Sequence, residues 1–270
     1  MRNRFIDLIH KEMSVNQNIV FLTADMGINL VEKIQLDFPD RFHNVGIAEQ
    51  NLVGIAAGLA ENGFRPFAYT ISNFLSIRAL EQIRNDIVMH QLPVTLVGTS
   101  TGFDNGPLGA THHMLEDWGI LSGMPNLNIS CPCTPSGVDS LFIECLSSNF
   151  PSYIRIPKGQ GIQNEISRIK NRKSLVISYG SASEYAINHA ISNDYDYLLV
   201  EKLKPFLIDD NLVANYQNII VIEDHFATIG LYSKMCQFVN EKRVDCHVTS
   251  IAPIGYDLHV QNRFEDFLRR

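Results

Sequence analysis

The stretch that decides the fold reads Arg41-Phe42-His43-Asn44-Val45-Gly46-Ile47-Ala48-Glu49-Gln50-Asn51-Leu52-Val53-Gly54-Ile55-Ala56-Ala57-Gly58-Leu59-Ala60. A helical pattern begins after Gly46, covers residues 48–62 and stops at Gly63. On that helix Glu49 shares one face with apolar residues spaced three and four positions apart. These residues are Leu52, Val53, Ala56, Ala57 and Ala60.

A carboxylate on an apolar stripe near a helix start has two interpretations. Glu49 can be a first-turn acid that the helix dipole favours, reaching back to a free amide. It can also be a functional acid at the edge of a tight interface, because Gly54 and Gly58 lie one turn apart among alanines and leave a nearly bare surface. Desolvation there would raise the pKa of the carboxyl group, which suits an acid that shares a proton with a ring nitrogen.

Short β-branched runs alternate with amphipathic stretches along the chain. The expected strands are 18–24, 93–99, 126–131, 153–156, 174–179, 197–201, 218–223 and 245–251. The expected helices are 2–13, 48–62, 73–90, 135–147, 183–192 and 230–241. Solidly apolar strands between helices are typical of parallel sheets that are buried on both faces. The sequence therefore predicts an α/β protein with two doubly wound domains, residues 1–160 and 174–270, joined by a polar linker at 161–173.

The bulk composition excludes several classes of function. The 270 residues are 45% hydrophobic with a formal net charge of -7 and no Lys/Arg cluster, so no nucleic-acid surface is expected. No apolar run approaches the roughly 20 residues that a membrane span needs. Acidic residues interrupt the apolar stretch at the start of the chain, which is therefore not expected to be a signal peptide. We therefore expect a cytoplasmic protein. The five cysteines are interpreted as reduced thiols in or near the core, with a metal or redox site as the alternative.

Several motifs in order resemble the pyrimidine-binding domain of transketolases and 1-deoxyxylulose-5-phosphate synthases. They are the stretch at 41–60, Ser72-Asn73-Phe74-Leu75, Thr111-His112-His113 and Pro151–Gly159. The second part is similar to the C-terminal domain of the family through Ser178–Ser181, Glu223-Asp224-His225 and Gly230-Leu231, although the usual glycine-rich stretch is reduced at 229–233. The resemblance implies a thiamine-diphosphate enzyme, whose cofactor carries the chemistry while the protein orients it.

By this resemblance, Glu49 hydrogen-bonds a ring nitrogen of the aminopyrimidine and acts in catalysis. Phe74, which would open a helix capped by Ser72 or Asn73, stacks on the same ring. Ile77 stands where the family has a second aromatic residue, so that side of the pocket would be aliphatic. Without the resemblance, Phe74 and Ile77 also fit an ordinary core stripe.

The resemblance also places His112 beside the substrate, where it could donate a hydrogen bond to a developing oxyanion. Taken alone, the His-His pair also fits metal ligation or a plain loop. Asp25 ends the first long strand, where α/β folds build sites, but it also fits a turn before Gly27. Arg2 and Lys158 match positions that contact sugar phosphate in transketolases; otherwise they are solvated side chains.

Two features of the chain depart from the family pattern. Leu108 stands four residues before His112, where the family usually has an aspartate that reads sugar hydroxyls. The segment 101–104 lacks the histidine that many transketolases place there. We therefore expect the donor or acceptor sugar to differ from the common pentose-phosphate substrates.

In the family, the diphosphate-binding domain carries a Gly-Asp-Gly motif that helps to hold Mg²⁺ bound to the diphosphate. This sequence does not contain Gly-Asp-Gly. We therefore expect Mg²⁺ ligands from a separate N-terminal, diphosphate-binding subunit, in an α2β2 assembly with thiamine diphosphate between the chains. The sequence predicts the C-terminal subunit of a split transketolase, which moves a two-carbon ketol unit from a ketose or ketose phosphate to an aldose. The alternatives are a 1-deoxyxylulose-5-phosphate-synthase-like or 2-oxo acid dehydrogenase β-type subunit, or a non-catalytic structural homologue.

Overall fold

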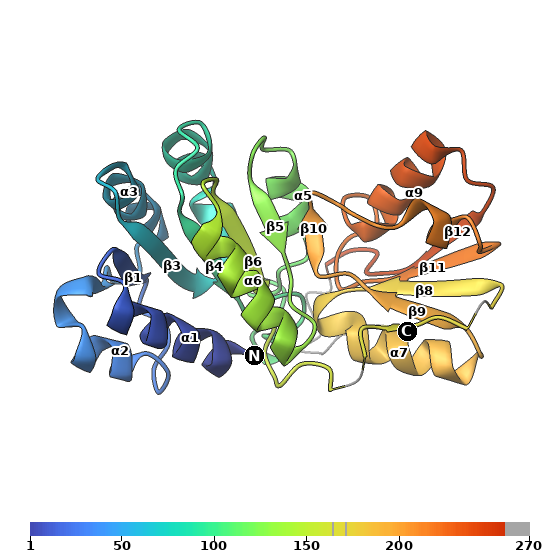
Figure 1. Ribbon diagram of the computed structural model, residues 1–270, viewed down its shortest axis with the longest axis horizontal. Helices are drawn as coiled ribbons and strands as arrows, with labels where there is room; N and C mark the ends of the chain where they lie inside the picture. Colours follow the sequence, from blue (N-terminus) through green and yellow to red (C-terminus); the bar gives the residue numbers. More distant parts are fainter. Residues whose placement is uncertain (164, 171, 257–270) are drawn as a thin grey trace.

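The computed structural model describes residues 1–163, 165–170 and 172–256, which form two mainly parallel sheets lying side by side (Figure 1). The first sheet has the strand order β10-β5-β6-β4-β3-β1-β2. Its strands are β1 (Ile19–Thr23), β2 (Phe42–Asn44), β3 (Arg65–Ile71), β4 (Thr95–Thr99), β5 (Asn128–Ser130), β6 (Ser152–Ile156) and β10 (Lys202–Lys204). The second sheet has the order β12-β11-β8-β9-β7. Its strands are β7 (Ser167–Arg168), β8 (Ser174–Ser178), β9 (Asp196–Leu199), β11 (Asn218–Ile222) and β12 (His247–Ile251).

Helices cover the sheets, as the expected α/β class requires, and this class is confirmed. The α-helices are α1 (Arg2–Val15), α2 (Glu32–Asp37), α3 (Glu49–Glu61), α4 (Leu80–Gln82), α5 (Asp117–Ser122), α6 (Pro135–Ser147), α7 (Ser183–Ser192), α8 (Asp210–Val213) and α9 (Leu231–Lys242). Two π-helical segments, η2 (Phe74–Arg78) and η3 (Ile83–Val88), flank α4, and short 3₁₀ turns are η1 (Pro39–Arg41), η4 (Gly106–Leu108) and η5 (Gly180–Ala182). None of the described helices is both long and apolar enough for a membrane crossing.

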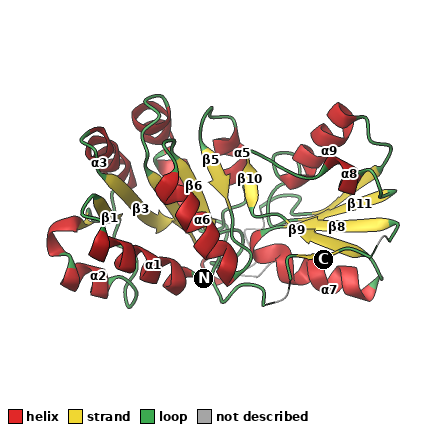
Figure 2. Cartoon of the chain, in the orientation of Figure 1, coloured by secondary structure: helices red, strands yellow, loops and turns green. Residues whose placement is uncertain are grey.

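Two apolar clusters lie on opposite faces of the first sheet. One joins α1, α2 and α6 to the sheet through residues such as Ile9, Ile34 and Phe142. The other packs α3 and the segment 74–88 on the opposite face and continues into the second sheet. Figure 2 shows α7 on one side of the second sheet and α9 on the other. The shared cluster means that the two sheets are packed against each other rather than tethered by a linker alone.

The chain crosses to the second sheet after β6, before the first sheet has received its last strand. β10 returns from the C-terminal part and pairs antiparallel with β5 at the edge of the first sheet (Figure 1). Within the range 161–173, expected as a linker, β7 adds an antiparallel edge to the second sheet by pairing with β9. The domain boundaries at residues 160 and 174 stay a prediction, since strands from the later part contribute to both sheets.

All eight expected strands are present, whereas β2, β3, β7 and β10 were not expected. β3 carries Pro66, and a proline inside a run normally argues against a central strand. The register resolves the conflict: Pro66 pairs with Val20 of β1, while β4 begins only opposite Phe67. The proline therefore lies near the start of β3, at a position where β4 provides no partner residue.

The segment 73–90 was expected to be one continuous helix, and it is irregular instead. η2 and η3 widen the backbone turn on either side of the three-residue α4. Single π-helical turns of this kind occur often at functional sites, because they shift the side chains that follow them around the helix. Phe74 and Arg78 belong to the first of these segments.

Candidate active site

Glu49 is the first residue of α3 and is 1% exposed. The apolar face expected from the sequence is confirmed, since all five of its hydrophobic members are buried with Glu49. The carboxylate of Glu49 accepts a hydrogen bond from Arg78, whose Nη1 lies 2.6 Å from Oε2. A buried carboxylate is therefore paired with a side chain that is 45% exposed.

Phe74 stands at the centre of the cluster. The guanidinium carbon of Arg78 lies 4.3 Å from the centre of the Phe74 ring, within the range of a cation–π contact. The ring of His112 meets Phe74 edge to face, with the ring centres 5.4 Å apart. Three segments that are distant in sequence thus bring a carboxylate, an aromatic ring and an imidazole to one place.

The loop that carries His112 is tied to the start of η2. The side-chain amide of Asn73 donates to the carbonyl of Thr111 at 2.8 Å and to that of His113 at 3.1 Å. The expected capping role of Asn73 is thus replaced by a contact with the histidine loop. Nδ1 of His112 lies 3.0 Å from the hydroxyl of Thr111, so Nε2 is the ring nitrogen turned away from that contact. Asn73 therefore fixes the backbone on both sides of His112.

His113, the neighbour of His112, is buried against Phe103 with ring centres 4.9 Å apart. Burial, and to a lesser extent the charge of His112, lowers the pKa of His113. His113 therefore packs against Phe103 inside the loop.

The outer side of the cluster is open. Gly54 and Gly58 lie on the exposed face of α3, and a Cβ atom at either position would have nothing within 4 Å. Ile77 is 45% exposed on the neighbouring segment. Glycine inside a helix costs roughly 1 kcal/mol relative to alanine, and the described residues supply no packing reason for these two.

Asp25 lies at the end of β1, in a left-handed conformation with φ of 50°. It is exposed and lies beside Asn44, whose side-chain oxygen accepts hydrogen bonds from the backbone N–H groups of Asp25 and Gly46. Asp25 is therefore connected to the turn that leads into α3. Its predicted role toward the cofactor stays a prediction.

Lys158 belongs to a second group, near the base of the histidine loop, and the charge of Arg2 acts on it. Nζ of Lys158 donates to the side chain of Asn105, and the backbone N–H of Lys158 donates to Asp104 at 2.6 Å. Burial and the charge of Arg2 lower the pKa of Lys158, against the attraction of Asp104. Burial raises the pKa of Asp104 to about 6.

A hollow of about 630 Å³ opens beside Lys158. Leu108, which is 57% exposed, lines it together with residues of the C-terminal part such as Ser181 and Glu184. The structure thus separates the predicted site residues into a cofactor-type cluster around Phe74 and a group at this hollow.

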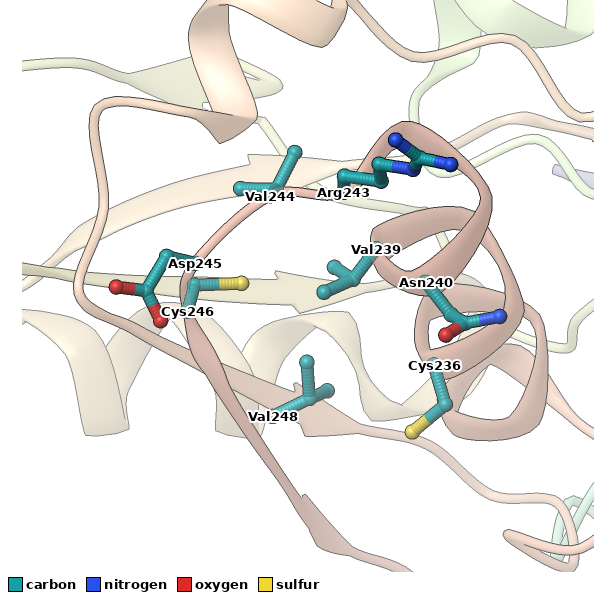
Figure 3. A pocket seen from close by; sticks show the side chains of 8 residues that line it. All are labelled: Cys236, Val239, Asn240, Arg243, Val244, Asp245, Cys246 and Val248. Carbon is teal, nitrogen blue, oxygen red and sulfur yellow. The ribbon is translucent and has the colours of Figure 1, made fainter.

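A second hollow, of about 550 Å³, lies elsewhere, between α9 and the segment leading into β12 (Figure 3). Its lining residues all belong to the range 236–248, and they include Cys236 and Cys246. The other three cysteines are buried, and all five are free thiols.

Sequence reasoning missed Arg78 and the buried ion pairs of Arg155 with Asp117 and Asp224. Arg78 follows Phe74 by four positions, so helical spacing could have placed both side chains on one face. The partners of Arg155 gave no such signal, because they are contributed by separate elements.

The cluster fits the pyrimidine half of thiamine diphosphate. Glu49 is a buried carboxylate beside an aromatic face, and a planar cation, the Arg78 guanidinium, already contacts both groups. A flat, basic aminopyrimidine needs the same two kinds of contact. In the described part of the chain, no three His, Cys, Asp or Glu side chains gather as ligands for a metal ion. The fit therefore concerns only the organic ring of the cofactor.

Comparison with known proteins gives a consistent result. Residues 1–162 match the family described as the transketolase pyrimidine-binding domain. The chain is 32% identical over 240 residues to the 1-deoxy-D-xylulose-5-phosphate synthase of Dictyoglomus turgidum, covering 81% of this chain and 38% of that protein. It is 38% identical over 143 residues to a putative transketolase C-terminal section of Methanocaldococcus jannaschii, covering 53% of this chain and 45% of that protein. The chain spans less than half the length of these curated relatives.

Among solved structures, a split-gene transketolase in an inactive β4 tetramer is similar with a TM-score of 0.82 and 25% identity. The match covers 99% of this chain and 92% of that one. The transketolase of Campylobacter jejuni shares the fold with a TM-score of 0.81 at 17% identity, and there the match covers 44% of the longer chain.

Proposed function

Because the chain belongs to the family of the transketolase pyrimidine-binding domain, we propose that it is the C-terminal subunit of a split transketolase. The observation that carries the proposal is the meeting of Glu49, Phe74 and His112 around one aromatic face. These are the residues that the family resemblance assigns to the cofactor and the substrate. The reaction would transfer a two-carbon ketol unit from a ketose or ketose phosphate to an aldose.

Thiamine diphosphate, when bound, would supply the carbanion chemistry that ketol transfer requires. In this proposal, Glu49 holds a ring nitrogen of the aminopyrimidine and shares a proton with it. The burial of Glu49 keeps competing water away from that contact. Phe74 presents its face to the ring, and Arg78 must yield part of its contact with Glu49 and Phe74.

His112 would act on the substrate. Since Nδ1 contacts Thr111, Nε2 is the nitrogen available to donate a hydrogen bond to a developing oxyanion. Asn73 holds the backbone on both sides of His112, so the imidazole would be oriented before substrate arrives. Lys158, in the hollow by Leu108, and Arg2, whose charge acts on Lys158, would contact the phosphate end of a sugar phosphate.

We propose that the diphosphate and Mg²⁺ are held by a separate diphosphate-binding subunit, with the cofactor between the chains in an α2β2 assembly. The structural similarity to a chain of a split-gene transketolase supports this proposal. The exposed glycine face of α3, which begins at Glu49, is the surface we assign to this association. A surface without side chains allows close approach of another backbone.

A second function has a specific observation in its favour. The curated relatives in the range of 30–33% identity include several 1-deoxy-D-xylulose-5-phosphate synthases. A synthase-type subunit would use the same Glu49 and Phe74 but would take pyruvate as donor. Leu108, in place of a hydroxyl-reading aspartate, is compatible with a donor that carries fewer hydroxyl groups.

The deciding experiment mixes this chain with a diphosphate-binding transketolase subunit, thiamine diphosphate and Mg²⁺. One reaction offers a ketose phosphate with an aldose phosphate; the other offers pyruvate with the same aldose phosphate. We expect ketol transfer in the first reaction only, and none from either subunit alone. Activity only in the reaction with pyruvate and the aldose phosphate would favour the synthase. Full activity of this chain without a partner would refute the divided enzyme.

A further inference from the structure

The loop that carries His112 closes on itself at a narrow neck. Gly102 and Met114 exchange both of their backbone hydrogen bonds, Gly102 N–H to Met114 carbonyl at 3.0 Å and Met114 N–H to Gly102 carbonyl at 2.9 Å. Residues 103–113 form the excursion between them. Because Met114 is two positions from His112, the position of the neck decides where the imidazole lies.

Arg155 of β6 holds the neck from below and is 0% exposed. Its Nη2 donates to the carbonyl of Met114 at 3.0 Å, and its Nε donates to Asp117 at 2.9 and 3.1 Å. Its Nη1 donates to Oδ1 of Asp224 at 3.1 Å. Every nitrogen of this guanidinium is thus engaged, so the group has one geometry.

Asp224 belongs to the C-terminal part, two residues beyond β11, and is 0% exposed. Its carboxylate lies directly against Gly102, where an added Cβ would be 1.8 Å from Oδ2. Gly102 has φ of +52°, a conformation in which other residues are strained. No side chain fits between the neck and Asp224, so a displacement of one must move the other.

The residues after Asp224 extend the same contact. The imidazole Nε2 of His225 accepts from the backbone N–H of Gly119 at 3.2 Å, and the N–H of Phe226 donates to the carbonyl of Leu115 at 3.1 Å. The segment 224–226 therefore touches both sides of the neck and the helix that follows it.

This segment is itself anchored. The preceding residue, Glu223, accepts hydrogen bonds from the first backbone N–H groups of α9, those of Leu231 at 2.7 Å and Tyr232 at 2.9 Å. The second sheet and α9 thus act as a rigid support for Asp224.

We infer that Asp224 is a positioning residue, through which the C-terminal part holds the histidine loop so that His112 faces Phe74. Asn73 binds the loop at Thr111 and His113, and Arg155, held by Asp224, binds it at Met114. The inference rests on the proposed function insofar as His112 contacts substrate. A buried ion pair by itself is weak evidence for stability, so a role in fixing geometry is the more specific explanation of this network.

The first measurement is hydrogen–deuterium exchange of the purified chain. We expect Asp224→Ala to increase exchange in residues 101–115, and Gly102→Ala to do the same although it keeps every charge. Asp224→Asn, which keeps the shape and an acceptor for Arg155, should have a smaller effect. The matched control is Asp196→Asn, another fully buried aspartate of the second sheet, bonded to Lys170, Arg172 and Tyr216 and not to the loop.

The second measurement is kinetic, on the enzyme assembled with its diphosphate-binding partner. We expect Asp224→Ala to lower kcat on the order of 10- to 100-fold and Asp224→Asn to lower it less, because a misplacement of about 1 Å can cost that much, with little change in cofactor affinity. Unchanged loop exchange in both Asp224→Ala and Gly102→Ala would overturn the inference, as would normal kcat with a mobilised loop. Failure of the wild-type enzyme to transfer any ketol unit would instead count against the proposed function, and the exchange result would still decide whether Asp224 holds the loop.

Discussion

Arg78 and Glu49 form an ion pair between two segments that lie 29 positions apart, with Nη1 2.6 Å from Oε2. The pair is asymmetric, because the carboxylate is buried and the guanidinium is half exposed. The same guanidinium covers Phe74, so one side chain satisfies the buried acid and shields the ring. Two of the predicted cofactor residues are thus linked by a residue that the sequence did not single out.

Arg78→Met should destabilise the chain, because it leaves the buried carboxylate of Glu49 without its cation. The expected loss is about 1–3 kcal/mol in the free energy of unfolding, measured in urea. Arg84→Met is the control, since Arg84 is exposed and donates to the neighbouring Asn85 and to the sulfur of Met89, not to a buried carboxylate. Equal stability of the two variants would mean that the Arg78 pair contributes nothing.

Glu49→Gln should keep the fold and remove most of the activity of the assembled enzyme. The amide matches the carboxylate in shape but cannot share a proton with a ring nitrogen. General acid–base contributions are typically about 10²–10⁴-fold, so turnover should fall by at least the lower figure. Steady-state assays measure the loss of turnover, and an unchanged circular dichroism spectrum shows that the variant has kept its fold. A variant that retains more than about a tenth of the activity would exclude Glu49 from catalysis.

Gly54→Leu should leave the isolated chain at least as stable and weaken its association with the diphosphate-binding subunit. A side chain at this position has open space around it and replaces glycine in a helix, which favours the folded helix by roughly 1 kcal/mol. Ser140→Leu, at an exposed position of α6, provides the control. Sedimentation of the mixed subunits measures association, and wild-type affinity of the Gly54 variant would remove α3 from the interface.

Acid should destabilise the protein through His225. Burial lowers the pKa of His225 to about 3, whereas a histidine in the unfolded chain takes up its proton near pH 6.5. Between these values the unfolded state binds more protons, so stability falls as the pH falls.

His225→Gln removes this titration while its amide oxygen can still accept from Gly119. We expect the variant to lose less stability than the wild type between pH 7 and pH 4, as followed by the thermal midpoint. His90→Gln, at an exposed position, should follow the wild type. Parallel curves for the wild type and the His225 variant would show that this histidine does not control acid sensitivity.

Much of the local structure was predictable because burial repeats with the period of the backbone. The apolar face of α3 with Glu49 follows the helical period, and the bounds of α6 and α7 agree with the expected ranges 135–147 and 183–192. Runs such as Asn218–Ile222 indicated buried parallel strands, as β11 is. β3 was not expected, because a proline such as Pro66 argues against a strand. β10 has only three residues, too few to show a period.

The sequence by itself determined the α/β class, the buried position of Glu49 and the family to which residues 1–162 belong. Only the tertiary structure decided which charges meet. Arg155 lies 38 positions from Asp117 and 69 from Asp224, and β10 joins a sheet whose other strands end before residue 157. Periodicity reports how each element is buried, whereas an ion pair depends on which strand ends and loops the completed topology brings together.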